Sequence, residues 1–439
     1  FSEDRLSYVQ KILGKPLGAH FKQLSKDSVY VKGSEEEFYL EPFAIPKNKE
    51  FAYGLFRQIF HHPHWNLSYV VHDWFSYMND HHQAFRKIET AEAYFEGLDQ
   101  ALLDTPAACN QCGHLSLQLC MSQPHITMMS VGMQSVSHIR STSDSKSFFV
   151  EGKKRWRWHL YSSLLIHSLG KYPFYDQRNT DPFNLTTNRH IEFELIWIAL
   201  SGGPMGFGDR IGRENKELIY RFVRPNGEIL RPDQVALPLD RCFWTNFEKR
   251  KMNEAATVVA CSAIHNLHGR ASYKLYYLLD MNISKTLKRA KTFYHFAEIL
   301  EEDEIRKKQN YVLFDRRSEE IQVIQEDQAL KSISGFRIYQ YRCVAPIQKG
   351  FAFFGDCNKA VSASSQLFSQ IHFEENTLRF TILRREKELS SRIVLYSKSS
   401  PNQVTIDGEV IPFIYQKEKV EFEINDGFVG QVTVCVTRK

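Results

Sequence analysis

Residues 68–78 read SYVVHDWFSYM, and both the fold and the kind of site to expect follow from this stretch. Tyr69, Val70 and Val71 favour a β-strand, and Asp73 stands at the point where a buried strand would end. A buried carboxylate without a partner is costly, so its position indicates an ion pair, a bound metal or a reaction.

Short apolar segments alternate with helical segments up to about residue 225, a pattern typical of β/α units around a parallel sheet. The helical segments carry apolar residues at helical spacing and include 51–61, 91–103 and 192–200. The segments predicted as strands are 17–21, 68–73, 115–120, 136–140, a short one near 172–176, and 200–208.

The pattern changes after about residue 228. Segments such as RIYQYRCVAPI, GFAFFGD and TLRFTILRR are short, rich in β-branched and aromatic residues, and separated by turn residues. They predict an antiparallel β-sandwich, interrupted by a helical excursion over 288–308. We therefore expect a β/α barrel domain over 1–227 and a β-sandwich domain over 228–439.

The composition is that of a well-packed globular protein, with 43% hydrophobic and 13% aromatic residues. A net charge of +5 arises from 56 basic and 51 acidic residues that are dispersed along the chain, so no nucleic-acid partner is expected. No apolar run approaches the roughly 20 residues that a membrane helix needs, so no membrane span is expected.

Two weak signs favour a secreted or lumenal protein, with a cytoplasmic location as the alternative. N-glycosylation sequons begin at Asn66, Asn184 and Asn282, and eight cysteines permit disulfides. Cys109 and Cys112 form a CxxC pair without a second such pair in the chain. They are therefore interpreted as ordinary thiols or a disulfide, and not as part of a zinc site.

Nearly every predicted strand ends on a polar side chain. In a β/α barrel the carboxyl ends of the strands converge on one rim, so these side chains predict a polar pocket. They are His20, Asp73, Cys120, Arg140 with Asp144 just beyond it, Asp176, and Asp209 at the end of the loop that contains Gly202 and Gly203.

Two carboxylates on different strands suggest glycosidic chemistry. One attacks the anomeric carbon while the other protonates the leaving oxygen, and a retaining mechanism places them roughly 5–5.5 Å apart. This chemistry needs no metal or cofactor. The alternative is that these groups form structural ion pairs, Asp73 with His72 or His20, and Asp144 with Arg140.

A metal-dependent hydrolase is a third interpretation. Its ligands would come from two histidine-rich stretches, HHPHW with His61, His62 and His64, and DHH with Asp80, His81 and His82. These histidines lack a regular ligand spacing with a carboxylate, so a solvated surface is the better interpretation.

Three longer stretches carry a resemblance to a known family. They are LQLCMSQPHITMMSVGMQSVSHIRSTSD (117–144), SLLIHSLGKYPFYD (163–176) and ALSGGPMGFGDRIGRENKELIYRFVRPNGEILRPDQVALPLDRCFW (199–244). In this order they resemble the glycoside hydrolase family of α-galactosidases, raffinose synthases and seed imbibition proteins. The resemblance implies a (β/α)8 TIM-type barrel followed by a β-sandwich.

The resemblance also implies roles for individual residues. Asp73 falls on the catalytic nucleophile after the fourth strand, and Asp144 on the general acid/base after the sixth. Trp74 would offer a stacking face for the sugar ring, unless it belongs to the core. Cys120 falls on a pocket position, Asp176 on a sugar-contacting position, and Gly202, Gly203 and Asp209 on the loop that closes the eighth strand.

Four positions depart from the family pattern. Val71 replaces a lysine, Ser145 an aspartate, Phe174 an acidic residue and Ile198 an arginine. Two functions therefore stay open. One is a retaining α-glycosidase or transglycosidase acting on an α-linked, galactose-like sugar, and the other is a catalytically silent subunit that binds carbohydrate or serves a structural role.

The length of chain before Asp73 leads to one further expectation. About 70 residues precede the predicted fourth strand, enough for the third strand and its helix but hardly for the first two. A barrel without two strands would expose open edges. We therefore expect strands three to eight here, with the rest of the barrel supplied by a separate N-terminal fragment or a partner chain.

Overall fold

In the computed structural model the chain falls into two compact units. Unit 1 comprises Phe1–Ser143 and Tyr161–Asp176, and unit 2 comprises Asp144–Leu160 and Gln177–Lys439. The structure describes residues 3–61, 65, 67–107, 113–143, 149–183, 190–243, 255–265, 271–282, 293–300, 309–325, 327–331 and 338–438.

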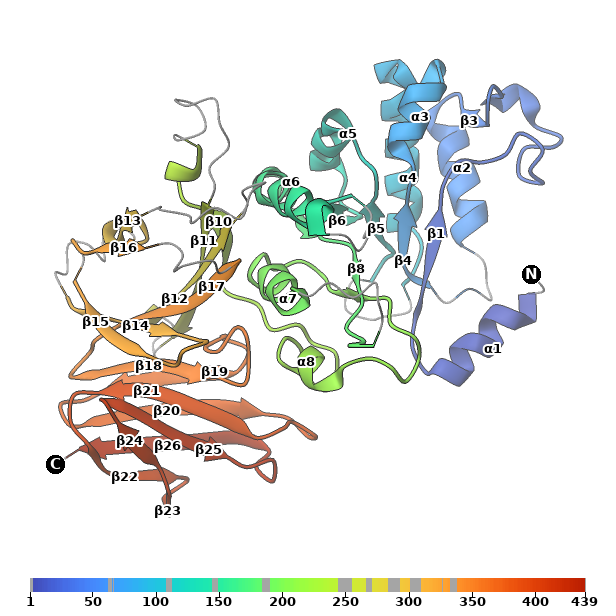
Figure 1. Cartoon of the computed structure of the whole chain (residues 1–439). Helices are drawn as coiled ribbons and strands as arrows, with labels where there is room; N and C mark the ends of the chain where they lie inside the picture. Colours follow the sequence, from blue (N-terminus) through green and yellow to red (C-terminus); the bar gives the residue numbers. More distant parts are fainter. Residues whose placement is uncertain are drawn as a thin grey trace. The chain divides into compact units, whose positions relative to one another are not determined.

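Unit 1 is built on a five-stranded parallel sheet in the order β1-β4-β5-β6-β7 (Figure 1). Its strands lie close to the predicted positions, because each is a run of β-favouring residues bounded by turn residues. They are β1 (Leu17–Phe21), β4 (Leu67–His72), β5 (Ser116–Leu119), β6 (Val136–Arg140) and β7 (Tyr172–Phe174).

Helices cover one face of this sheet. The long helices α2 (Lys49–Phe60) and α4 (Ile88–Leu103) contact one another, and α4 also contacts β5. Their apolar residues pack with Leu67 and Val70 of β4 in one hydrophobic core. The shorter elements of unit 1 are α1 (Glu3–Leu13), β2 (Phe38–Tyr39), β3 (Ile45–Pro46), α3 (Phe75–His81) and α5 (Pro124–Met129); α6 (Phe149–Ser168) runs through both units.

Gly97 allows α4 to pack closely on α2, and this contact gives a stability prediction. A Cβ atom at Gly97 would lie 2.6 Å from the Ala52 Cβ and 2.7 Å from the Lys49 carbonyl oxygen. Gly97→Ala should therefore lower the free energy of unfolding by about 1–3 kcal/mol, because the two helices must separate. Gly54→Ala in α2 is the matched control. A Cβ there meets no atom within 4 Å, so this change should raise stability by up to about 1 kcal/mol.

Urea unfolding of both variants measures the difference. An equal rise in the unfolding midpoint for the two substitutions would contradict the close α2–α4 contact.

Unit 2 begins with elements that continue the β/α pattern. β8 (Gln177–Arg178) and β9 (Gly206–Phe207) form a two-stranded parallel pair, and the helices are α7 (Ile191–Leu200) and α8 (Lys216–Tyr220). The prediction of a strand over 200–208 is wrong for most of that range. Leu200 ends α7, Gly202 takes a left-handed φ of 69° in the turn that follows, and the strand is confined to β9.

The rest of unit 2 consists of antiparallel sheets (Figure 1). The Phe353 ring of β18 packs 5.1 Å from Phe368 of β19 and 4.6 Å from Phe380 of β20, so the two C-terminal sheets face each other as the predicted sandwich. The first sheet has the strand order β10 (Gln234–Pro238), β11 (Ala255–His265), β12 (Ala271–Asn282), β17 (Tyr339–Pro346), β14 (Tyr311–Asp315) and β15 (Ile321–Ile324). The second has the order β18 (Phe351–Asp356), β21 (Ser391–Ser397), β25 (Lys419–Ile424) and β24 (Ile414–Gln416). The third has the order β19 (Phe368–Phe373), β20 (Thr377–Arg384), β26 (Gly430–Arg438), β22 (Pro401–Ile406) and β23 (Glu409–Ile411).

Two fold predictions are corrected or limited by these elements. Within the described residues the parallel strands form an open sheet and no closed barrel, although the α/β class is confirmed. The helical excursion predicted over 288–308 is described only at 293–300. There Phe293 and Tyr294 belong to β13 (Phe293–His295), which pairs with β16 (Ala329–Lys331), and only a short 3-10 helix, Phe296–Glu298, follows.

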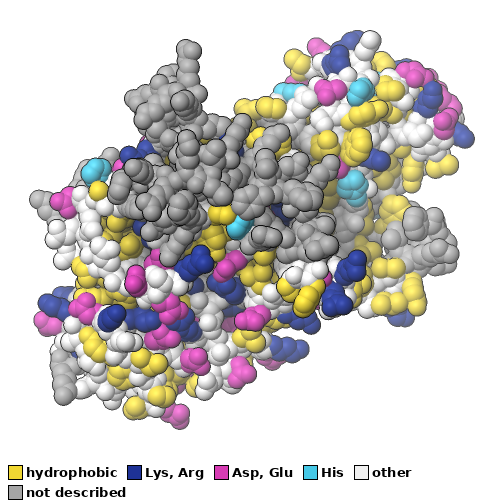
Figure 2. All heavy atoms as spheres, viewed as in Figure 1, with side chains coloured by type: hydrophobic (Ala, Val, Ile, Leu, Met, Phe, Trp, Pro, Cys, Tyr) yellow, Lys and Arg dark blue, Asp and Glu magenta, His cyan; other side chains and the backbone are white. Residues whose placement is uncertain are grey.

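Surface charges are mixed on the face drawn in Figure 2, where Lys and Arg lie among Asp and Glu. The chain also forms surface ion pairs, such as Lys26–Glu41 at 2.7 Å and Arg385–Glu228 at 2.8 Å. None of the described helices is both long enough and apolar enough to cross a bilayer.

The structure bears on one sequon and on most cysteines. Asn282, at the end of β12, is 2% exposed and leaves no room for a glycan, which corrects that prediction. Asn66, Asn184, Cys109 and Cys112 lie outside the described residues. Among the described residues, six cysteines form no disulfide: Cys120, Cys242, Cys261, Cys343, Cys357 and Cys435.

Candidate active site

The strand ends of unit 1 bring five polar side chains into one connected row, in the order of the sheet. His20 of β1 lies with its Nε2 atom 3.1 Å from Oδ2 of Asp73, which follows β4. The Cys120 thiol, after β5, hydrogen-bonds to Asp73 and accepts from Nη1 of Arg140 at 3.4 Å. Nη2 of Arg140, the last residue of β6, donates to Oδ2 of Asp176 at 2.6 Å. We call these five residues the strand-end row.

The sheet register explains why these residues meet. His20 pairs with Val71 in the β1–β4 ladder, so it shares a face with Asp73 two residues further on. The same alternation places Cys120 and Arg140 on this face, since Gln118 pairs with His138 and each lies two residues before them. The row therefore occupies the face opposite to the helix-covered core.

Left-handed backbone follows three of the five strands at this edge. Trp74 has a φ of 67°, Met121 of 50° and Asp176 of 104°. Such conformations cost a non-glycine residue about 1–3 kcal/mol, and they gather where a site needs side chains aimed in an unusual direction. All three residues lie directly after strands of the sheet, namely β4, β5 and β7.

Asp73 is held as an oriented carboxylate. Its Oδ1 accepts from the Trp74 backbone N–H at 2.7 Å, and its own N–H donates to the Phe21 carbonyl at 2.8 Å. Partial burial acts to raise the pKa of Asp73, but hydrogen bonds from Cys120, the Trp74 N–H and His20 outweigh it, so the pKa lies below its ordinary value. At neutral pH Asp73 is ionised, and its side chain is 14% exposed.

Cys120 acts on Asp73 as a hydrogen-bond donor. Burial raises the pKa of Cys120 to about 12, although the Arg140 guanidinium favours the thiolate. The thiol therefore keeps its proton at neutral pH and is a poor nucleophile. The guanidinium of Arg140 stays paired with Asp176, and both side chains are largely buried.

Of the structural ion pairs considered as an alternative for Asp73, the structure contains the one with His20 and not the one with His72. Asp73 does contact His20, as one of them requires, whereas His72 meets only the Asp73 carbonyl oxygen, with Nδ1 at 3.3 Å. Burial lowers the pKa of His72 to about 3, so this histidine is neutral beside Tyr94, whose hydroxyl lies 2.6 Å away. Asp144 lies outside the described residues, so its distance from Asp73 and its pairing with Arg140 stay predictions.

A second polar layer lies below the row, and the sequence predictions missed it. Gln118 Oε1 is 2.9 Å from His138 Nε2, and Ser137 Oγ is 2.7 Å from His138 Nδ1. In the sheet Gln118 pairs with Val71 on one side, and His138 pairs with Tyr172 on the other. The signal was present in the sequence, because Gln118 and His138 each stand two residues before a strand-end residue.

Trp74 is a surface residue, so its interpretation as a core residue is wrong. The side chain is 38% exposed and carries the Lys22 ammonium 5.1 Å above its ring. Tyr77, also exposed, packs edge-on to Trp74 at 5.6 Å. Together the two rings form an exposed aromatic surface directly beside Asp73.

The predicted site residues of unit 2 form a hydrogen-bonded turn of their own. Asp209 Oδ1 accepts from the backbone N–H groups of Thr180 and Asp181 at 2.6 and 2.9 Å, and its Oδ2 accepts from the Thr180 hydroxyl at 2.7 Å. Gly202 and Gly203 are buried in the turn after α7. Asp209 therefore fixes the loop after β9 to the loop after β8.

The histidine-rich stretches do not form a metal site in the described part of the chain. There, no group of three or more His, Cys, Asp or Glu side chains could hold a metal ion. His82 is buried with Nε2 3.1 Å from the Phe43 carbonyl oxygen, and His81 packs on Tyr77. His62 and His64 lie outside the described residues.

Comparison with known proteins identifies the family. The family model described as raffinose synthase or seed imbibition protein Sip1 matches residues 86–424, well over half of the 439-residue chain. The chain belongs to this family. The matched range contains Cys120, Arg140 and Asp176, whereas His20 and Asp73 precede it.

Two plant relatives of the family match over a short segment. The probable galactinol–sucrose galactosyltransferase 5 of Arabidopsis thaliana is 42% identical over 59 residues, 13% of this chain and 8% of that protein. The galactinol–sucrose galactosyltransferase of Pisum sativum is 39% identical over 59 residues, 13% of this chain and 7% of that protein. The matching segment thus spans less than a tenth of each relative.

Solved structures share only a distant likeness. The α-galactosidase I of Mortierella vinacea has a TM-score of 0.43 at 10% identity, covering 76% of this chain and 77% of that one. The GH27 β-L-arabinopyranosidase of Geobacillus stearothermophilus has a TM-score of 0.47 at 13% identity, covering 78% and 76%.

Proposed function

We propose that the strand-end row of this raffinose synthase family member binds and transfers an α-linked, galactose-like sugar, with Asp73 as the nucleophile. The observation that carries the proposal is the state of Asp73, an ionised and oriented carboxylate that hydrogen bonds hold at a strained strand end. A carboxylate in this state can attack an anomeric carbon and form a covalent glycosyl intermediate.

The second carboxylate of the proposed double displacement is Asp144. Its assignment rests on the resemblance, which places it four residues beyond Arg140. In this role Asp144 protonates the leaving oxygen in the first step. In the second step it takes the proton from the attacking water or sugar hydroxyl.

The remaining members of the row would bind the sugar. The Arg140–Asp176 pair presents a donor and an acceptor beside Asp73, and His20 stands on the other side at the open end of the row. Trp74 offers its exposed face to the hydrophobic side of a sugar ring. The names of the two plant relatives describe galactosyl transfer between galactinol and sucrose, which favours transfer to a second sugar over hydrolysis.

We further propose that strands from outside this chain complete the parallel sheet. Among the described residues β1 is the terminal strand of the sheet, and its His20 side chain is exposed. An uncovered edge strand is a template for further pairing. A separate N-terminal fragment or a partner chain that adds parallel strands beside β1 would cover this edge.

The direct test is an assay with 4-nitrophenyl α-D-galactopyranoside as donor and sucrose as acceptor. The proposal expects release of 4-nitrophenol together with a galactosylated sucrose product. Saturable binding of galactose without any turnover would instead favour the catalytically silent subunit. The reason to keep that alternative is that Val71 and Phe174 stand where the family pattern has charged residues.

A further inference from the structure

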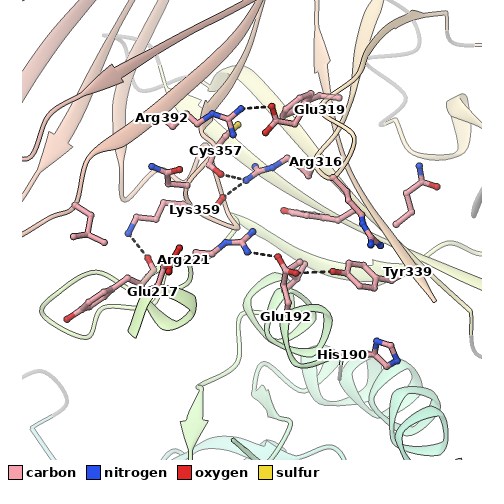
Figure 3. A pocket seen from close by; sticks show the side chains of 18 of the residues that line it. His190, Glu192, Glu217, Arg221, Arg316, Glu319, Tyr339, Cys357, Lys359 and Arg392 are labelled. Atoms are coloured by element: carbon pink, nitrogen blue, oxygen red, sulfur yellow. Dashed lines mark hydrogen bonds and ion pairs between the residues drawn. The ribbon is translucent and has the colours of Figure 1, made fainter. Parts of the chain in front are cut away.

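A large polar cavity lies within unit 2, away from any residue used above. It has a volume of about 990 Å³, and residues from several chain segments line it (Figure 3). They come from α7, α8, the turn after β14, β17, the loop after β18 and the start of β21. Pockets of about 300–1,000 Å³ are the usual size for small-molecule sites.

The cavity wall carries charged side chains that are already paired. Glu192 of α7 accepts from Arg221 and also from the Tyr339 hydroxyl at 3.3 Å. Across the cavity Arg392 Nη2 donates to Glu319 at 2.7 Å (Figure 3). All four charged side chains stay between 22% and 41% exposed, so they can still reach a ligand.

This pairing points to the chemical class of the ligand. The Arg221–Glu192 pair is neutral as a whole. Arg392 and Glu319 are also balanced, because Arg392 donates to Glu421 as well and Glu319 accepts from Lys419. Both groups present fixed N–H donors and carboxylate acceptors a short distance apart. A hydroxyl group both donates and accepts, so vicinal hydroxyls match such a surface. Because the donors and acceptors are held before the ligand arrives, little ordering free energy is lost on binding.

Tyr339 adds an aromatic surface and a fixed donor to the same wall. Its ring lies 5.0 Å from that of Phe193, which limits its rotation. Burial, together with the neighbouring Glu192 carboxylate, raises the pKa of Tyr339 to about 12, so the hydroxyl keeps its proton at neutral pH. Tyr220 of α8 also lines the cavity. Rings beside polar pairs suit a sugar, which has one apolar face and a polar rim.

Two further cations of the lining, Arg316 and Lys359, are already used within the protein. Arg316 donates to the carbonyl oxygens of Cys357 and Lys359 at 2.7 and 2.9 Å, and the Lys359 ammonium donates to the Tyr220 carbonyl at 2.6 Å. These donors therefore serve the backbone of the cavity wall. Arg317 and Glu217 also line the cavity, so a ligand meets charges of both signs beside the paired groups.

We propose that this cavity is a second carbohydrate-binding site, which takes a neutral di- or trisaccharide and works independently of the strand-end row. The saccharide places hydroxyls against Arg221, Glu192 and Arg392, and a ring face against Tyr339. No bond is made or broken there, so the site would hold a substrate or product chain and not transform it.

Isothermal titration with sucrose and with raffinose tests the proposal. Arg221→Met and Tyr339→Phe each remove one donor from the cavity and should weaken binding about tenfold or more. The Arg221–Glu192 pair is partly exposed, so its loss should change stability by no more than about 1 kcal/mol and leave the fold intact.

Two further proteins complete the experiment. Arg385→Met is the matched control, because it breaks a surface ion pair with Glu228 that does not line the cavity, and it should bind as the unaltered chain does. Asp73→Asn should retain the cavity's binding even if the strand-end row has no catalytic activity. Absence of saturable binding to either sugar would overturn the proposal. So would binding that the cavity variants leave unchanged, or cavity-dependent binding of inorganic phosphate in place of sugar.

Discussion

Changing Asp73 to Asn is expected to lower kcat/KM for galactosyl transfer by about 10³-fold or more. The amide keeps the shape of the side chain but removes the negative charge that attacks the anomeric carbon, and such losses are large when a nucleophile is removed. The hydrogen bonds from Trp74 and Cys120 that lower the pKa of Asp73 would no longer serve a carboxylate. The galactoside assay described above provides the measurement.

Asp104→Asn is the matched control for that experiment. Asp104 follows α4 and accepts a hydrogen bond from the Tyr53 hydroxyl at 2.9 Å, outside the strand-end row. It should retain activity within about twofold. Equal activities for the two variants, with both proteins folded, would remove Asp73 from the chemistry.

The second large effect is expected on stability, at Arg224. This buried guanidinium donates from Nε to Glu388 at 2.6 Å, and from its two Nη atoms to the carbonyl oxygens of Gln366 and Leu383, each at 2.8 Å. Arg224→Met should lower the free energy of unfolding by about 3–5 kcal/mol, because it leaves the Glu388 carboxylate buried without its partner. Thermal or urea unfolding measures the loss.

Two further variants separate the buried charge from simple loss of packing. The double variant Arg224→Met with Glu388→Leu removes both charges and should recover part of the lost stability. Arg385→Met, at an exposed ion pair, should change stability by less than about 1 kcal/mol. A loss at Arg224 as small as that at Arg385 would contradict the proposed role of the buried pair.

Arg224 also shows what one part of the family-like stretch 199–244 does. The stretch RPNG places Gly227 at a φ of 88° in a turn that Arg224 closes, with its backbone N–H donating to the Glu228 carbonyl at 2.8 Å. This turn fixes Arg224 against residues of the β-sandwich. This part of the stretch 199–244 therefore has a structural role within unit 2.

The parallel strands of unit 1 could be predicted because local signals agree there. A run such as 68–72 combines β-favouring residues with alternating burial, and the flanking turn residues mark its ends. The stretch 200–208 lacked that agreement. Its small residues permit a turn as readily as a strand, and the helix 191–200 continued to Leu200. The stretch 293–295 became a strand through pairing with 329–331, a contact that no local pattern reveals.

The residues of the strand-end row could likewise be predicted from the sequence, but their hydrogen-bond partners could not. The carboxyl ends of the predicted strands placed His20, Asp73, Cys120 and Arg140 at one rim, and the structure connects all four. The partner of Arg140 was less predictable, because Asp144 is closer in sequence than Asp176. Only the parallel pairing of β6 with β7 brings Asp176 next to Arg140.

The most direct test of the central claim is covalent trapping with a mechanism-based α-galactosyl inhibitor, followed by peptide mapping. With Asp73 as the nucleophile, the sugar label is expected on Asp73 and is absent from the Asp73→Asn variant. A label on any other carboxylate, or a folded and sugar-binding protein that no such inhibitor labels, would contradict that claim.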